Sequence, residues 1–228
     1  QYSNLGFGFI GTLVEKHSGQ RFGDYAQRRI LKPLGMQASF TAADLPAIDR
    51  LATLYRWEDD SWQAQADDFH GRRPPSLIPP DYKPGRNGIV FSPHGGLRVS
   101  ALDLSKLLRA LMAGGFHDNA RILREKTVEL MRQPQWLVSA GREFYATGLG
   151  LHLVSPYGNN GSLWIGHSGV ASGLQSDMYY QFEGRYGVVF ATNGIKPQPK
   201  LPAPTSRFRD QIAETVLASM RRLTKEGW

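Results

Sequence analysis

The spacing of apolar residues predicts helices in the first half of the chain. Apolar side chains recur at steps of four from Leu5 to Leu13, which is typical of a helix over residues 4–18. Ser3 or Asn4 is suited to cap this helix, because a short polar side chain accepts a hydrogen bond from the first turn. Glycines interrupt the same stretch and weaken it as an isolated helix, so they indicate close packing against a neighbouring element.

Further helices are predicted at four places. They lie over about 22–31, from a cap at Ser100 to Gly114-Gly115, over about 123–133 and over about 206–224. Leu51–Trp57 and Trp62–Ala66 predict a short hairpin. The stretch from Arg72 to Gly88 is rich in proline and glycine, and a loop of that length often lines a site or serves as a lid.

From about residue 147 the apolar period changes to two, which predicts strands. They are expected over Thr147–Val154, Leu163–Ile165, Leu174–Phe182 and Tyr186–Thr192. Tight turns join consecutive strands, so the sheet should be antiparallel. Helices, then antiparallel strands, then a helix argue for one α+β domain over 1–228. Residues 1–145 would be mostly helix and loop, and 146–228 would hold the strands and the C-terminal helix.

Composition narrows the classes of function. Of 228 residues, 41% are hydrophobic and 21% charged, as in an ordinary globular domain. The net charge of +7 is scattered along the chain, which indicates a solvated surface and no nucleic-acid partner. No apolar run approaches the ~20 residues of a membrane span. Cysteine is absent, and the six histidines lack metal-binding spacing, so we expect no metal or other cofactor.

Tyr2-Ser3-Asn4 and His167-Ser168-Gly169 are the candidate chemical motifs. Alone, the first is explained by a helix cap beside an aromatic residue, and the second by a hydrogen-bonded histidine at the end of a strand. A Ser-His-Asp triad is disfavoured, because adjacent strand residues point to opposite faces and His167 is badly placed to activate Ser168. A Gly-x-Ser-x-Gly nucleophile elbow is excluded, because position 170 is Val.

With their flanks, the two motifs resemble the serine β-lactamase and penicillin-binding-protein superfamily, in the group of class C β-lactamases, D,D-peptidases and family VIII esterases. Tyr2–Met36 is similar to that group's Tyr-x-Asn region, and Trp164–Gly169 is similar to its Lys-Thr-Gly motif with His in place of Lys. The resemblance implies an antiparallel sheet flanked by helices, with a helical subdomain and with the N-terminal part absent. A histidine carries at best a partial charge near neutral pH, which favours a peptidase or esterase over an efficient β-lactamase.

The resemblance also implies roles for individual residues. Tyr2 would be catalytic and move the proton between the nucleophile and the leaving group. Such a phenol, with an ordinary pKa near ~10, needs nearby cations to act as a base. The implied substrate-binding residues are Asn4, His167, Ser168, Gly169, Ser172 and Asn193. Ser172 would supply a backbone N–H to the oxyanion hole. For Asn193, an Asn-Gly turn at the end of a hairpin explains the residue as well as contact with a substrate carboxylate does.

The superfamily takes its nucleophile from a Ser-x-x-Lys motif, and these 228 residues contain none. We therefore expect the intact protein to be a serine acyl-transfer hydrolase that acts on an amide, lactam or ester carbonyl, and this chain alone to be inactive. The alternative is a non-catalytic binding or scaffold protein of the same fold. The missing N-terminal segment is a candidate partner. Localisation is open between a periplasmic or secreted place, which is favoured, and the cytoplasm.

Overall fold

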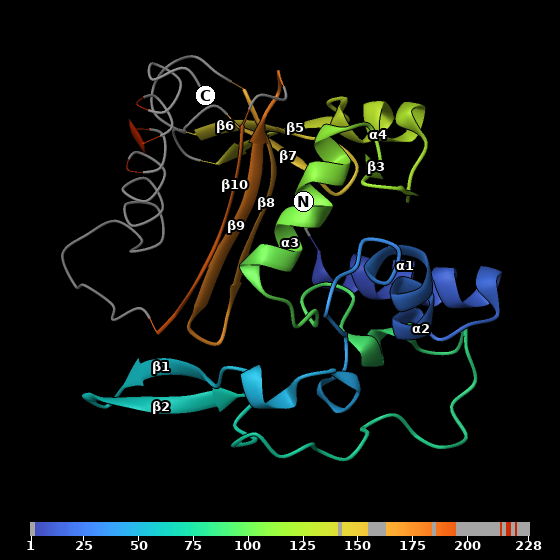
Figure 1. Ribbon diagram of the computed structural model, residues 1–228, viewed down its shortest axis with the longest axis vertical. Coiled ribbons are helices and arrows are strands. Elements are labelled where there is room, and N and C mark those ends of the chain that lie inside the picture. The colour runs from blue at the N-terminus through green and yellow to red at the C-terminus, as the bar shows by residue number, and fades with distance from the viewer. Residues whose placement is uncertain are drawn as a thin grey trace.

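The computed structural model describes residues 3–140, 143–154, 163–183 and 186–194, together with 215, 218, 219 and 222. Its helices are α1 (Asn4–Ser18), α2 (Phe22–Ala26), a π-helix η1 (Gln27–Leu31), the 3₁₀ turns η2 (Ala42–Asp44), η3 (Ile48–Arg50) and η4 (Gly88–Phe91), α3 (Ala101–Met112) and α4 (Glu125–Arg132). Figure 1 shows α1 and α2 grouped to one side of the sheet, with α3 between them and the long strands.

The described strands form three antiparallel sheets. They are β1 (Leu54–Glu58), β2 (Ser61–Ala66), β3 (Phe116–His117), β4 (Ala120–Arg121), β5 (Trp136–Ala140), β6 (Glu143–Thr147), β7 (His152–Val154), β8 (Trp164–Ala171), β9 (Leu174–Gln181) and β10 (Gly187–Asn193). The main sheet has six strands in the order β10-β9-β8-β7-β6-β5, while β1-β2 and β3-β4 are separate pairs. This mixture of helices and an antiparallel sheet confirms the predicted α+β class.

Capping side chains define the start of the two long helices. Ser3 precedes α1, and its Oγ accepts a hydrogen bond of 3.1 Å from the N–H of Gly6. Ser100 precedes α3 and accepts one of 3.0 Å from the N–H of Asp103. Of the two caps considered for the first helix, the structure therefore has Ser3, and Asn4 is the first helical residue.

Helix α1 packs through its glycines. A Cβ added to Gly8 would lie 2.9 Å from Ile89, and one added to Gly11 would lie 2.5 Å from Pro93, so the helix backbone lies directly on η4 and the residues after it. The apolar side of α1 is more than half exposed and comprises Leu5, Phe9, Ile10 and Leu13. The close packing predicted from the glycines is confirmed, with the apolar stripe on the outer side.

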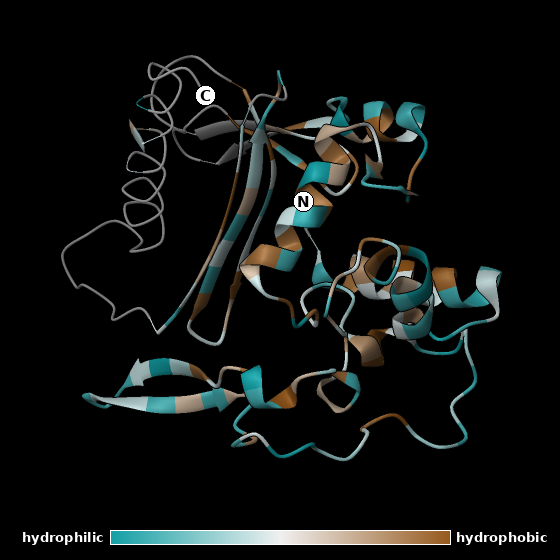
Figure 2. Ribbon diagram, in the orientation of Figure 1, coloured by the Kyte–Doolittle hydropathy of each residue, from teal (hydrophilic) through white to brown (hydrophobic). Residues whose placement is uncertain are grey.

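Helix α3 joins two hydrophobic clusters. One cluster fills the space between α3, α4 and the sheet and comprises Leu108, Leu111, Val128, Leu151, Leu153, Ile165 and Tyr180. The other lies on the side of α2 and comprises Leu31, Leu34, Met36, Ala38 and Ala110. In Figure 2, α3 alternates between apolar and polar residues, as a helix with partners on more than one side should. The core therefore fixes the sheet relative to the helical region.

Two predicted boundaries are wrong. The sheet begins at Trp136 in β5, inside the region expected to be helix and loop. The strand expected over Thr147–Val154 is divided between β6 and β7, because the chain turns back at residues 148–151, where Gly148 bonds Leu151 and Gly150 has a φ of 70°. The final helix expected over 206–224 lies largely outside the described residues. Within that range only residues 215, 218, 219 and 222 are described, and all four are helical.

Candidate active site on strand β8

The His167-Ser168-Gly169 motif lies in the middle of β8, which among the described strands pairs along its whole length with β9 and along part of its length with β7. All eight residues of β8 pair with β9. On the other side, β7 pairs only with Trp164, Ile165 and Gly166. The five residues from His167 to Ala171 therefore have an edge that β7 leaves open. Such an edge can accept another extended backbone.

The hydrogen-bond pattern shows which groups point to this open edge. Phe182 donates its N–H to the carbonyl of Leu163 at 2.7 Å, so these opposed residues form a hydrogen-bonded pair of the β8–β9 ladder. Hydrogen-bonded pairs alternate with non-hydrogen-bonded pairs along an antiparallel ladder. Counting from Leu163, the backbone groups of His167 and Gly169 therefore bond to β9. The N–H and C=O groups of Ser168 and Val170 then point away from β9, toward the edge that β7 leaves open.

A tight turn ends this edge. Ser172 and Gly173 connect β8 to β9 with φ values of 49° and 83°. Two positive φ values in a two-residue loop are typical of a type I′ turn, whose twist matches that of the strands. Ser172, the residue expected to supply an oxyanion donor, therefore lies in the turn and outside the ladder.

The side chains of His167 and Ser168 have separate partners. The imidazole Nδ1 of His167 lies 2.6 Å from the backbone carbonyl of Ser168, a contact that requires a hydrogen on Nδ1 and leaves Nε2 as the acceptor in the neutral ring. The same ring stacks on His152, with 4.3 Å between ring centroids. The hydroxyl of Ser168 lies 3.1 Å from the phenol oxygen of Tyr179. These contacts agree with the expectation that His167 does not activate Ser168.

The remaining predicted residues are distributed over two regions. Asn4 is exposed at the first turn of α1. Tyr2 lies outside the described residues. Asn193 ends β10 and pairs with Leu174 in the register, so it lies at the same end of the sheet as the β8–β9 turn.

Asn193 uses both ends of its amide. Its Oδ1 accepts a hydrogen bond of 3.0 Å from the N–H of Tyr55, and its Nδ2 donates one of 2.5 Å to the carbonyl of Thr53. Both partners are backbone groups at the start of the β1–β2 hairpin. The residue thus joins the sheet to the hairpin, a contact that no local pattern in the sequence indicates.

A buried carboxylate was also missed. Glu15 of α1 is fully buried, and its oxygens accept hydrogen bonds from the N–H of Phe22 at 2.9 Å, the hydroxyl of Tyr82 at 2.5 Å and the N–H of Gly85 at 2.9 Å. Burial of the phenol, together with its hydrogen bond to Glu15 and the charge of Glu15, raises the pKa of Tyr82 to about 12. Glu15 therefore ties the proline- and glycine-rich loop to α1.

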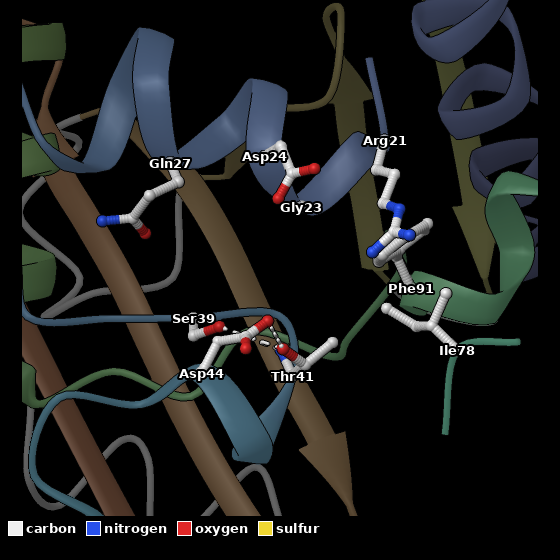
Figure 3. A pocket seen from close by; sticks show the side chains of 9 residues that line it. All are labelled: Arg21, Gly23, Asp24, Gln27, Ser39, Thr41, Asp44, Ile78 and Phe91. Atoms are coloured by element: carbon white, nitrogen blue, oxygen red, sulfur yellow. Dashed lines mark hydrogen bonds between the residues drawn. The ribbon is translucent and has the colours of Figure 1, made fainter. Parts of the chain in front are cut away.

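A cavity of about 220 Å³ lies in the helical region (Figure 3), and its lining includes no residue of β8. Its lining combines a cation, two carboxylates, polar side chains and apolar groups: Arg21, Gly23, Asp24, Gln27, Ser39, Thr41, Asp44, Ile78 and Phe91. Thr41 donates a hydrogen bond of 2.5 Å to Asp44, so part of the polar wall is satisfied internally. None of the predicted site residues lines this cavity.

The part of the chain that the structure describes contains no cluster of three or more His, Cys, Asp or Glu residues suited to hold a metal ion. Nor do its helices include one that is both long and apolar enough to cross a bilayer.

Comparison with known proteins gives the family. A family model described as Beta-lactamase matches residues 1–210. Penicillin-binding protein 4 of Amycolatopsis lactamdurans is 29% identical over 225 residues, which cover 96% of this chain and 52% of that protein. The chain thus spans about half the length of this curated relative.

Two solved structures show the same fold. The D-amino acid amidase of Ochrobactrum anthropi SV3, complexed with L-phenylalanine amide, matches with a TM-score of 0.66 at 22% identity, over 96% of this chain and 58% of that one. A penicillin-binding protein of Bacillus halodurans matches with a TM-score of 0.60 at 20% identity, over 98% of this chain and 56% of that one. Together with the antiparallel sheet and the motif on β8, these matches confirm the resemblance seen in the sequence: the chain belongs to the beta-lactamase family.

Proposed function

We propose that this chain carries the substrate-binding part of a serine hydrolase that acts on an amide, ester or lactam carbonyl through an acyl-enzyme. The observation that carries the proposal is the position of the His-Ser-Gly motif on β8, directly after Gly166, where the pairing of β8 with β7 ends. A strand in this position suits a substrate whose backbone lies antiparallel to it. The amide- and penicillin-directed names of the similar proteins support the same class of substrate.

The reaction would divide between this chain and a nucleophile outside these 228 residues. The serine oxygen forms a bond to the carbonyl carbon, and the C–N or C–O bond to the leaving group breaks, while the serine proton passes to that group. Tyr2 is proposed to transfer this proton, with Asn4 bonded to the substrate amide. Water then cleaves the acyl-enzyme and restores the serine.

The His-Ser-Gly motif would orient the substrate. Nδ1 of His167 donates to the carbonyl of Ser168, so Nε2 is the ring nitrogen proposed to contact a substrate carboxylate. The Ser168 hydroxyl would add a hydrogen bond. Gly169 keeps β8 close to β9, since a Cβ there would come within 2.6 Å of Ser176.

The alternation of the ladder favours Val170 over Ser172 as the oxyanion donor from this strand. The N–H of Val170 is directed to the open edge, whereas Ser172 is in the turn with a positive φ. A donor fixed by the backbone needs no rearrangement when the carbonyl oxygen becomes negative, which makes such groups effective in acyl transfer.

The test compares this chain with the longer protein that includes the residues upstream of Gln1. We expect the longer protein to be labelled by fluorescent penicillin or to hydrolyse p-nitrophenyl esters, and the chain alone to do neither. Val170→Pro removes the edge N–H without removing a bond to β9, so it should lower the acylation rate by about 10²–10³. Val170→Ala keeps the N–H and is the matched control, because the valine side chain is 68% exposed.

Acylation of the chain alone would show that its nucleophile lies within these residues. An inert longer protein would refute the acyl-transfer function. Equal rates for Val170→Pro and Val170→Ala would exclude Val170 as the donor.

A further inference from the structure

The β1–β2 hairpin needs support from the rest of the molecule, because a two-stranded hairpin is at best marginally stable alone. One support is at the end of β2. Arg98 donates hydrogen bonds of 3.0 and 2.9 Å to the two carboxylate oxygens of Asp67, and another of 2.8 Å to the carbonyl of Gly96. This bidentate pair is partly buried and holds the hairpin to the helical region.

The second support is Asn193, which ends β10 of the main sheet. Its amide bonds the carbonyl of Thr53 and the N–H of Tyr55, as the peptide group of a neighbouring strand would. The turn that ends β8 is locked against the same place. A Cβ on Gly173 would lie 1.8 Å from the carbonyl oxygen of Tyr55, and the carbonyl of Gly173 accepts a hydrogen bond of 3.1 Å from Gly194.

Three aromatic residues share one face of the hairpin. Trp57 pairs directly with Trp62, and Tyr55 lies two residues before Trp57 on the same face. The two indoles meet edge to face, with 5.1 Å between ring centroids. Trp62 lies against Gly194, where an added Cβ would be 3.1 Å from its ring, yet it stays 44% exposed. The rings are thus fixed beside the end of the sheet and still accessible.

The end of β8 lies beside this hairpin. Figure 1 shows the hairpin beneath the lower ends of β8 and β9, and Gly173 of the turn between these strands lies against Tyr55. A substrate that lies along β8, as proposed above, and extends past Ala171 would meet the hairpin. Flat apolar groups bind well to such aromatic surfaces.

We propose that Asn193 is a positioning residue: its amide locks the aromatic hairpin to the end of β8, and the hairpin then selects substrates with an aryl group on the acyl side. Both hydrogen bonds described for this amide are to backbone groups of the hairpin, so the residue acts on the substrate through the hairpin. The selection step rests on the proposed function, whereas the locking step can be measured on this chain alone.

The locking step is tested by limited trypsin digestion, with mass spectrometry of cleavage after Arg56 on β1. Asn193→Ala should accelerate this cleavage about tenfold, because the hairpin loses both hydrogen bonds to the amide. Gln63→Ala is the matched control on the same hairpin, since Gln63 is exposed and bonds only the nearby Ser61 among the described contacts. Equal cleavage of the unmodified chain and Asn193→Ala would overturn the proposal.

A conservative variant adds a chemical rescue. In Asn193→Asp, an ionised carboxylate still accepts from Tyr55 but repels the carbonyl of Thr53, whereas a protonated one can donate to it. The Tyr55 amide resonance should therefore differ from that of the unmodified chain at pH 7. The Tyr55 resonance of Asn193→Asp should move back toward its position in the unmodified chain as the pH falls through about 4. A resonance that stays displaced at low pH counts against the two-ended lock.

The selection step is tested on the longer protein with p-nitrophenyl phenylacetate and p-nitrophenyl acetate. Asn193→Ala should raise the KM ratio of phenylacetate to acetate about fivefold, roughly the value of one aromatic contact. An unchanged ratio with accelerated Arg56 cleavage would refute selection by the hairpin. If the unmodified longer protein hydrolyses neither ester and is not labelled by fluorescent penicillin, the acyl-transfer function fails, and the trypsin result still decides the role of Asn193 as a lock.

Discussion

Replacing Glu15 by alanine should be among the most destabilising single substitutions in the helical region. The carboxylate is fully buried and accepts hydrogen bonds from three groups in two other segments: the N–H of Phe22, the hydroxyl of Tyr82 and the N–H of Gly85. Alanine would leave these donors without an acceptor in a space that water enters poorly. The loop that contains Tyr82 would lose its main polar attachment to α1.

The size of the effect follows from the three bonds. A hydrogen bond to a charged group contributes about 1.5–3 kcal/mol, and bonds that share one acceptor are not fully additive. We therefore expect the free energy of unfolding to fall by about 4 kcal/mol in Glu15→Ala. Glu15→Gln keeps one acceptor oxygen but points its NH₂ group at donors of the loop, so its free energy of unfolding should fall by about 2 kcal/mol. Tyr82→Phe removes one hydrogen bond, and its free energy of unfolding should also fall by about 2 kcal/mol.

Urea unfolding followed by circular dichroism measures these losses, with Tyr82→Phe also serving to isolate the phenol. Because the folded pKa of Tyr82, about 12, exceeds its ordinary value, the contribution of the phenol is complete below pH ~10 and falls between pH ~10 and 12. The difference in stability between the unmodified chain and Tyr82→Phe should narrow in that window. A loss under about 1 kcal/mol in Glu15→Ala would refute the buried three-bond arrangement.

Two other substitutions test the anchor of the hairpin and the start of α3. Gly173→Ala should lower the melting temperature and accelerate proteolysis of the hairpin, because a Cβ would lie 1.8 Å from the Tyr55 carbonyl and φ is +83°; unchanged melting would contradict the contact. Burial raises the pKa of Asp103, but hydrogen bonds from Lys106 and the N–H of Gln37 outweigh it and hold the pKa below its ordinary value. The stability that Asp103→Asn loses should therefore be present at neutral pH and disappear as the pH falls below about 4; an equal loss at pH 7 and pH 3 in urea titrations would contradict this sign.

Local signals predicted much of the fold. Ser100 caps α3, as its sequence indicates. The predicted hairpin forms as β1 and β2, with Trp57 and Trp62 on either side of its turn. The position of the His-Ser-Gly motif within a strand also follows from local pattern. These features depend on residues close together in the chain, where capping and alternation act.

The errors arise where distant backbone groups decide the outcome. The expected strand over 147–154 is a hairpin that pairs Thr147 with His152, and its turn contains Gly148 and Gly150, which alternation of apolar residues alone does not reveal. β5 was missed because an edge strand is defined by its pairing with β6. The Asn193 lock joins residues 138 and 140 positions apart. Glu15 had a signal that could have been used: it follows Gly8 and Gly11 on the same helical face, where a solvated carboxylate is out of place.

The glycine face of α1 has a consequence for how the chain tolerates substitution. In most surface helices the large apolar residues are buried and tolerate few substitutions, whereas small residues on the outer face tolerate many. Here alanine at Gly8 or Gly11 would push α1 away from Ile89 and Pro93, whereas Leu5, Phe9 and Leu13 are more than half exposed. A mutational scan of this helix should therefore find Gly8 and Gly11 intolerant of substitution and these large apolar residues tolerant of it.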